Sequence, residues 1–223
     1  MTVDIAFLKS IPYFEGLNPV ELDSILKLIF EKTAQRGEII VFEGEPAEAL
    51  YFVSSGAVKM FKTSADGKEQ ILSIVRPGES FNDVPVFDGG QNPASAGAMG
   101  PVILYGIEKP DMDVVLQEHP QVALNVITVL VSQVRRLVTL VEDLSFRHVV
   151  SRVAKILINY GGNGTDSEQR LTQQDMAAMA GTAREVVGRS LKALEADGMI
   201  RMERHRIVVT NREALEEMAE VSP

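Results

Sequence analysis

The chain of 223 residues contains no cysteine. This absence excludes disulfides, cysteine-ligated iron–sulfur clusters, cysteine-type zinc sites and thiol catalysis, and it fits a reducing compartment. The first ten residues hold an early acid and no long apolar run, so we expect no signal peptide. The longest apolar stretch, residues 122–134, includes four polar side chains and ends at two arginines. We therefore expect no membrane span, no membrane partner and a cytoplasmic location.

Histidine is also scarce, with three in the chain: His119, His148 and His205. Because none precedes His119, a β domain in the N-terminal half lacks the converging ligands of a metal-dependent cupin enzyme. There is no nucleophile–base pair and no glycine-rich phosphate loop, so we expect neither enzymatic activity nor a metal site. A surface or packing role is the simplest interpretation of His148, which lies at a predicted hinge where a titratable group can also bias domain orientation.

Charge is unevenly distributed along the chain. The net charge is −9, which alone argues against nucleic acid as a partner. Residues 1–148 hold 12 basic and 20 acidic side chains, whereas residues 149–223 hold 10 and 11. Residues 181–212 hold 7 basic and 4 acidic side chains. A locally basic segment can bind DNA phosphates, and the acidic remainder would limit non-specific binding.

The apolar pattern changes along the first half of the chain. Residues 1–35 carry apolar side chains at helical spacing, and Asn18-Pro19 opens a second predicted helix. From residue 37 to 108, short β-type runs at 38–42, 50–53, 58–62 and 70–75 alternate with turns at Gly44, Gly56, Gly67 and Gly78. This pattern predicts an antiparallel β-roll or jelly roll. We assign it to a domain of residues 1–118 in an α+β fold.

A single long helix is predicted from residue 120 to 144. Its apolar residues recur in steps of four and three over about three heptads, at Ala123, Ile127, Leu130, Val134, Leu137, Val141 and Leu144. This spacing predicts a two-stranded coiled coil, so residues 119–147 are assigned as the dimerisation helix of a homodimer. An ordinary core helix of a monomer is the alternative. It fits less well because the seam continues beyond Arg135 and Arg136 into a polar region.

Two short helices are predicted at 172–180 and 183–197, separated only by Gly181-Thr182. Both starts have capping-box spacing, in Thr172 with Asp175 and in Thr182 with Glu185. So tight a joint is typical of a helix-turn-helix. Strands at 200–202 and 206–210 would add a wing. We assign residues 148–223 to a winged helix-turn-helix domain.

The second helix of this pair carries chemistry suited to reading bases. At about 100° per residue, Arg184, Glu185, Gly188 and Arg189 share one face at the N-terminal end, which is the end that enters a major groove. Arginine can hold guanine O6 and N7, and glutamate can accept from cytosine N4. A solvated face with Glu185 as a helix cap is the alternative, but the wing and the upstream coiled-coil helix favour DNA.

The segment LTQQDMAAMAGTAREVVGRSLKALEADGMI, followed by a basic wing and IVV, resembles the winged helix-turn-helix of the Crp/Fnr family of bacterial transcription regulators. The AREVVGR run is most similar to the cyclic-AMP receptor branch. Residues 37–108 and the RRL…EDLSF helix resemble the family's sensor barrel and dimer helix. The resemblance implies a homodimer on a two-fold-symmetric operator, with RNA polymerase and a small-molecule effector as further partners.

The resemblance also assigns roles to individual residues. It gives base readout of a TGTGA-like half-site to Arg184, Glu185 and Arg189. It gives contacts with DNA phosphates to Thr182, Lys192, Arg201, Arg204 and Arg206. Ala183 stands where this branch commonly has serine, so one phosphate-binding hydroxyl is missing.

By the same resemblance, an effector pocket follows Pro77-Gly78 and includes Phe81, Asp83, Val84, Pro93, Ala94, Ser95 and Leu137. Members that bind cyclic AMP use a glutamate for the ribose and an Arg-Ser pair for the phosphate. Here Asp83 takes the glutamate position, and Pro93 and Ala94 take those of the pair. An unpaired phosphate in a half-buried pocket costs several kcal/mol, and Ser95 can supply one hydrogen bond at most. We therefore expect that cyclic AMP does not bind.

The sequence leaves the identity of the effector open. Iron–sulfur clusters are excluded, and haem is left without support because Met60, Met99 and Met112 are expected in the core. An organic acid, an aromatic compound or another small molecule fits equally well. Two alternative functions also remain: a nucleotide-type sensor subunit acting on another protein rather than on DNA, and a regulator that has lost its ligand. A sensor subunit of this kind would be expected to keep the phosphate-binding arginine and to need no DNA-reading helix.

Overall fold

The structure is a computed structural model that describes residues 5–160, 171–203 and 206–220. Internal packing divides the chain into two compact units. The first comprises Met1–Lys62 and Ser73–Arg136, and the second comprises Thr63–Leu72 and Leu137–Pro223. The long helix α5 (Pro120–Phe146) contributes to both.

The N-terminal segment is helical only in part. It forms α1 (Ile5–Ser10), the 3-10 turn η1 (Pro12–Phe14) and α2 (Pro19–Leu26), which begins at a capping box between Asn18 and Glu21. The expected helical pattern up to residue 35 is wrong at its end, because β1 (Ile29–Ala34) is a strand paired with β8 (Val102–Glu108). Phe30 lies over Gly106 of β8, in the space that a side chain there would fill. This cross-strand packing overrides the local helical spacing.

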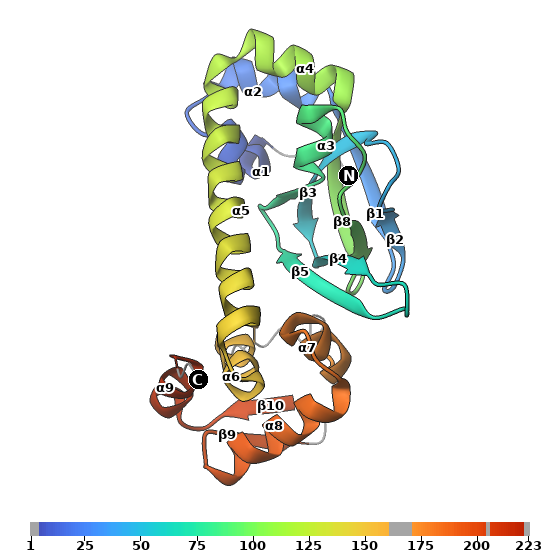
Figure 1. The fold of residues 1–223 in the computed structure, drawn as a ribbon. Coiled ribbons are helices and arrows are strands. Elements are labelled where there is room, and N and C mark those ends of the chain that lie inside the picture. Colours follow the sequence, from blue (N-terminus) through green and yellow to red (C-terminus); the bar gives the residue numbers. More distant parts are fainter. Residues whose placement is uncertain (1–4, 161–170, 204–205, 221–223) are drawn as a thin grey trace. The chain divides into compact units, whose positions relative to one another are not determined.

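Two four-stranded antiparallel sheets form the β-roll that the sequence predicts (Figure 1). One has the order β1-β8-β3-β6 and the other β2-β7-β4-β5. The remaining strands are β2 (Ile39–Val41), β3 (Ala49–Ser55), β4 (Val58–Thr63), β5 (Glu69–Val75), β6 (Ser80–Phe81) and β7 (Ser95–Ala98). Buried side chains from both sheets, such as Val53, Val58, Ala96 and Leu104, form one core cluster. Gly56 turns the chain with φ +84°, and a side chain there would collide with the backbone of Pro101.

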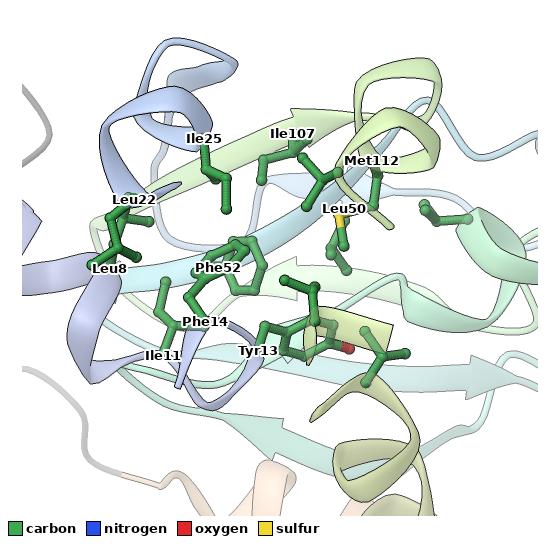
Figure 2. Close-up of a cluster of buried hydrophobic side chains, with 14 residues drawn as sticks. Leu8, Ile11, Tyr13, Phe14, Leu22, Ile25, Leu50, Phe52, Ile107 and Met112 are labelled. Carbon is green, nitrogen blue, oxygen red and sulfur yellow. The ribbon is translucent and has the colours of Figure 1, made fainter. Parts of the chain in front are cut away.

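A second core cluster joins the N-terminal helices to the β-roll (Figure 2). Tyr13 and Phe14 of η1 pack with Phe52 of β3, with ring centroids 5.4 and 5.5 Å from that of Phe52. The short helix α3 (Asp83–Asp88), the helix α4 (Lys109–Glu118) and the first half of α5 also contribute to it. Residues 80–88, which carry the predicted effector position Asp83, are thus anchored on this core.

The second unit contains the helix-turn-helix and wing in the predicted order. It comprises α6 (Val149–Tyr160), α7 (Gln173–Ala180), α8 (Arg184–Ala196), β9 (Ile200–Glu203), β10 (Arg206–Val209) and α9 (Arg212–Glu220). Its own core draws on all of these helices, with Leu157, Met176, Leu191 and Leu215 among the buried side chains. Residues 161–170, Arg204 and His205 lie outside the described residues.

Candidate nucleic-acid interface and sensor site

The joint between α7 and α8 is built from a cap and a glycine. Thr172 caps α7 as predicted: its Oγ1 accepts from the Asp175 amide at 3.1 Å, and the Asp175 carboxylate accepts from the Thr172 amide at 2.9 Å. Gly181 ends α7 with φ +61°, a left-handed conformation that suits glycine. The Thr182 amide then donates to Ala177 O at 3.0 Å, which holds the turn against α7.

The predicted capping box at the start of α8 is wrong. The N-cap is Ala183, which makes no side-chain cap, and its carbonyl accepts from the amides of Val186 and Val187 at 3.0 and 3.2 Å. The Thr182 amide is already used to close α7, so the chain enters the new helix one residue later than the spacing suggested. Glu185 therefore does not cap this helix, and its carboxylate is not committed to that role.

α8 presents two distinct faces. Val187, Ser190, Leu191 and Leu194 are buried against the domain core. The three predicted base-reading residues, Arg184, Glu185 and Arg189, are all exposed. Gly188 adjoins them, and the nearest atom to a side chain built there is Gln173 Oε1 at 4.0 Å, so the backbone can be approached closely. The arrangement brings two cations and one anion to the same exposed end of a helix.

The predicted phosphate contacts are only partly described. Lys192 and Arg201 are exposed, and Thr182 is half-buried. Arg201 pairs with Glu203 of its own strand at 2.9 Å. Arg204 and the side chain of Arg206 lie outside the described part of the chain. These assignments stay predictions.

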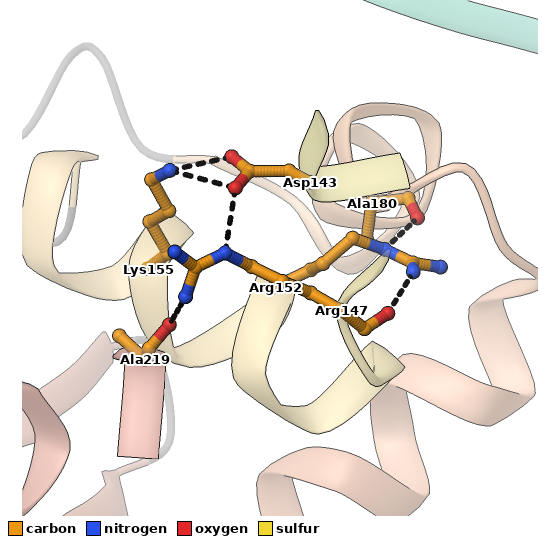
Figure 3. A network of polar contacts seen from close by, with 6 residues as sticks. All are labelled: Asp143, Arg147, Arg152, Lys155, Ala180 and Ala219. Carbon is orange, nitrogen blue, oxygen red and sulfur yellow. Dashed lines mark hydrogen bonds and ion pairs between the residues drawn. The ribbon is translucent and has the colours of Figure 1, made fainter. Parts of the chain in front are cut away.

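A polar network, missed by the sequence reasoning, holds the helices of this unit together (Figure 3). At the end of α5, Asp143 forms an ion pair with Arg147, whose Nε lies 2.8 Å from Oδ1, and it accepts from Lys155 Nζ of α6 at 2.6 and 2.8 Å. Arg147 also donates to Ala219 O, and Arg152 Nε donates to Ala180 O at 2.9 Å. Both arginines thus bind carbonyls in the last turns of α9 and α7, which lack helical partners.

Burial lowers the pKa of Arg152 from its ordinary value, and the Asp143 carboxylate opposes that shift. Arginine nevertheless remains protonated in proteins, so the network keeps its charges. Little in the sequence indicates this network, because Asp143 and Lys155 lie on different helices.

Asp83, in the predicted sensor segment, is buried and hydrogen-bonded. Asp83 is 4% exposed; its carboxylate accepts from the hydroxyls of Tyr13 and Ser80, the latter at 2.7 Å, and from Gln133 Nε2 at 3.2 Å. Burial and the Asp83 carboxylate raise the pKa of Tyr13 well above its ordinary value, so this hydroxyl stays protonated and donates. None of these three donors was singled out from the sequence.

The other predicted pocket residues are divided between buried and exposed positions. Phe81 is buried and stacks on Tyr51 at 5.3 Å between centroids, and Ala94 is buried. Val84 and Leu137 are exposed. Pro93 is exposed as well.

Polar contacts tie the chain around residues 93–95 to β4 and to the end of β2. Lys62 Nζ donates to the Pro93 carbonyl at 3.2 Å and pairs with Glu43 Oε1 at 2.7 Å. The Ser95 hydroxyl accepts from the Glu43 amide at 3.0 Å. In this contact the Ser95 oxygen accepts from the backbone, and the hydrogen that could be donated to a phosphate is not used.

α5 carries an exposed apolar stripe, although its register differs from the predicted seam. The exposed members, in steps of three and four, are Leu124, Ile127, Val131, Val134, Val138 and Val141. They share Ile127, Val134 and Val141 with the prediction. Leu130 instead packs against the first unit's core, and Ala123 and Leu144 are only half-exposed. Leu137 is exposed beside the stripe.

By length and composition, α5 also passes as a membrane span, as no other helix does in the part of the chain that the structure describes. Composition of this kind is weak support for insertion. The exposed apolar residues follow one stripe, and the second half of the helix carries Arg135, Arg136, Glu142 and Asp143. A single stripe with a 3,4 repeat suits a second helix better than lipid.

The described residues contain no cluster of three or more side chains able to hold a metal ion. His119 is the C-cap of α4, and its ring lies 3.7 Å from Glu21 Oε1 and 3.5 Å from Ser24 Oγ of α2. His148 is exposed at the start of α6, where its carbonyl accepts from the Arg152 amide at 3.1 Å.

Comparison with known proteins agrees with this architecture. The family model of the cyclic nucleotide-binding domain matches residues 31–119, and that of the Crp-like helix-turn-helix domain matches residues 151–218. The chain is 32% identical to the cyclic AMP receptor protein of Thermus thermophilus, over 95% of this chain and 98% of that protein. It is 28% identical to a CRP-like cAMP-activated global transcriptional regulator of Mycobacterium tuberculosis, over 91% and 93% of the two chains.

Among solved structures, FixK2 from Bradyrhizobium japonicum superposes with a TM-score of 0.77 at 24% identity, over 87% of this chain and 99% of that one. A β-roll, a long helix and a winged helix-turn-helix in this order define a class of sensor-linked DNA-binding proteins. The chain belongs to the Crp/Fnr family of transcription regulators and carries its Crp-like DNA-binding domain.

Proposed function

We propose that this protein is a cytoplasmic transcription regulator that binds a palindromic operator as a homodimer, under the control of a small molecule other than cyclic AMP. The observation that carries the DNA-binding part is the exposed face of α8 formed by Arg184, Glu185 and Arg189. In a major groove these side chains offer bidentate donors to guanine and an acceptor to cytosine. RNA polymerase is the further partner, because regulators of this family act on transcription.

The exposed stripe on α5 supports self-association. Six large apolar side chains in one line are costly to leave in water, and a second copy presents the same line in return. Pairing through α5 also supplies two copies of α8, as a palindrome requires. The alternative of a sensor subunit acting only on another protein does not account for the DNA-binding domain.

The residues of the sensor segment support an effector other than cyclic AMP, even though the two relatives named above are named for it. A cyclic nucleotide needs a positive partner for its phosphate, and Pro93 and Ala94 occupy the corresponding positions. Asp83, at the ribose position, already accepts three hydrogen bonds from the protein.

The effector proposal is tested by calorimetry with purified protein. We expect no heat of binding for cyclic AMP at concentrations up to about 100 μM. That concentration would saturate a site with a micromolar dissociation constant. Affinity in the micromolar range or tighter would contradict the proposal. Mass spectrometry of small molecules that co-purify with the protein is the direct route to the true effector.

The DNA-binding proposal is tested by selecting operators from random duplexes and measuring fluorescence anisotropy. Both are performed with and without a small-molecule extract of the source cells. We expect a palindrome with TGTGA-like half-sites about one helical turn apart. Arg189→Ala should cost roughly 1–3 kcal/mol per half-site on that sequence and much less on random DNA.

Arg212→Ala is the matched control, because Arg212 lies on α9 and pairs with Glu216 at 2.8 Å. It should leave base preference unchanged. If no palindrome emerges under either condition, or if Arg189→Ala keeps full specificity, the assignment of α8 as the reading helix fails.

A further inference from the structure

The carboxylate of Asp83 lies at the centre of hydrogen bonds from three separate parts of the first unit. Tyr13 belongs to η1, Ser80 to β6 and Gln133 to α5, and all three donate through neutral groups. A buried carboxylate is tolerated only where donors replace its lost hydration. Each of these bonds therefore supports the burial of the charge.

Tyr13 also contacts α5 directly, through its main chain. Its main-chain carbonyl accepts from Asn125 Nδ2 at 3.0 Å, while its hydroxyl donates to Asp83. Its ring is buried in the cluster of Figure 2 and stacks on Phe87 of α3 at 6.4 Å between centroids. We call the closed set of Tyr13, Asp83, Asn125 and Gln133 the Tyr13 bracket. It begins and ends on α5, at two positions eight residues apart.

The bracket fixes how α5 is rotated about its own axis. At about 100° per residue, Asn125 and Gln133 fall on the same side of the helix as the buried Val122 and Val126. The centre of the exposed stripe lies roughly 150° around from them. Holding Asn125 and Gln133 therefore sets the direction in which the stripe faces.

We propose that the Tyr13 bracket is the joint through which the sensor segment controls α5, with Tyr13 and Gln133 as positioning residues for DNA binding. In this role Asp83 serves α5 rather than a ligand's ribose. The inference rests on the proposed function, because α5 must pair with a second copy for its orientation to place two reading helices on one operator.

The test places a second carboxylate against Asp83 and then removes the first. At pH 8, Gln133→Glu either keeps two negative charges in contact or must take up a proton at a cost in free energy, and both weaken the joint. Adding Asp83→Asn restores complementarity: the new amide oxygen still accepts from Tyr13 and Ser80, and its nitrogen donates to the introduced glutamate. Ser132→Glu adds the same charge at an exposed neighbouring position on α5 and is the matched control.

Two quantities are measured: hydrogen exchange of the amides at residues 126–136 without DNA, and the dissociation constant for the selected operator. Gln133→Glu should speed exchange at least about tenfold and weaken operator binding at least about fivefold. The double variant should return both to within about twofold of the parent chain, and the control should change neither. If Gln133→Glu does not fold, Tyr13→Phe replaces it and should shift both quantities in the same direction, about threefold.

A double variant no better than Gln133→Glu would show that the two side chains are not coupled and would overturn the joint. Faster exchange with unchanged operator affinity would make the bracket structural only, which also overturns the proposal. Failure of the parent chain to select any operator contradicts the proposed function instead. That outcome is distinguishable because the exchange measurements need no DNA.

Discussion

At the scale of single residues, Asp83 shows that the position of a residue in the chain need not determine its role. The family resemblance predicts Asp83 at the position of a ribose-binding glutamate, yet its hydrogen bonds go to Tyr13, Ser80 and Gln133. The change from glutamate to aspartate shortens the side chain by one methylene. A carboxylate drawn back in this way is within reach of internal donors. A shorter acidic residue at the same place can therefore support the fold instead of a ligand.

The raised pKa of Tyr13 leads to a prediction at alkaline pH. A tyrosine whose folded-state pKa lies above its unfolded value contributes stability below about pH 10 and loses it as the pH rises further. The parent chain should therefore lose stability above about pH 10, by up to roughly 1.4 kcal/mol per pH unit from this group. Burial and Glu48 also raise the pKa of Tyr51, which adds to the slope.

Tyr13→Phe should remove the Tyr13 share of this slope and cost roughly 1–3 kcal/mol at neutral pH, because Asp83 loses a donor. Urea unfolding of both proteins at pH 7, 9, 10 and 11 measures the two effects. A parent-minus-variant difference that stays constant from pH 9 to 11 would contradict the assigned environment of Tyr13.

At the scale of elements, α5 has one packed face and one exposed apolar face. One face packs Val122, Val126 and Leu130 on the first unit's core, and the other exposes the apolar stripe. The sequence pattern alone could not separate them, since valine and leucine occur on both. The division decides which substitutions test dimerisation and which test folding.

Val134→Asp should convert the dimer to a monomer, because it places a charge in the centre of the stripe without disturbing the core. Light scattering measures the mass. Circular dichroism should show that the helix content outside the α5 interface is unchanged. Ser132→Asp, an exposed position off the stripe, should remain dimeric. Leu130→Asp should instead lower the unfolding temperature of the first unit. A dimeric Val134→Asp protein would show that α5 does not form the interface.

At the scale of the whole molecule, the protein carries a net charge of −9, the same sign as the DNA that its helix-turn-helix domain binds. The acidic majority lies before residue 149, whereas the exposed end of α8 gathers arginines. Attraction to phosphates is therefore local, and the rest of the chain opposes non-specific binding. Affinity should depend steeply on salt in spite of the overall sign.

Lys192→Ala should weaken specific and random DNA alike and reduce the slope of log K against log salt by about 2 per dimer, since each copy loses one phosphate contact. Anisotropy titrations between about 50 and 200 mM salt measure that slope. Lys27→Ala, at the C-cap of α2, removes the same charge from the first unit, where Lys27 pairs with Asp23 at 2.8 Å. Equal slopes for the two variants would mean that net charge, rather than a contact at Lys192, sets the salt dependence.

The sequence by itself determined the order of elements, the β-roll with its turn glycines, the Thr172 cap and the membership of the Crp/Fnr family. Each of these depends on neighbours in the chain or on motifs of fixed spacing. The tertiary structure decided that residues 29–34 form a strand, that α8 begins at Arg184, and which face of α5 is exposed. It also brought Tyr13 and Gln133 to Asp83, from 70 and 50 residues away. Such contacts depend on packing between distant segments, which local periodicity does not encode.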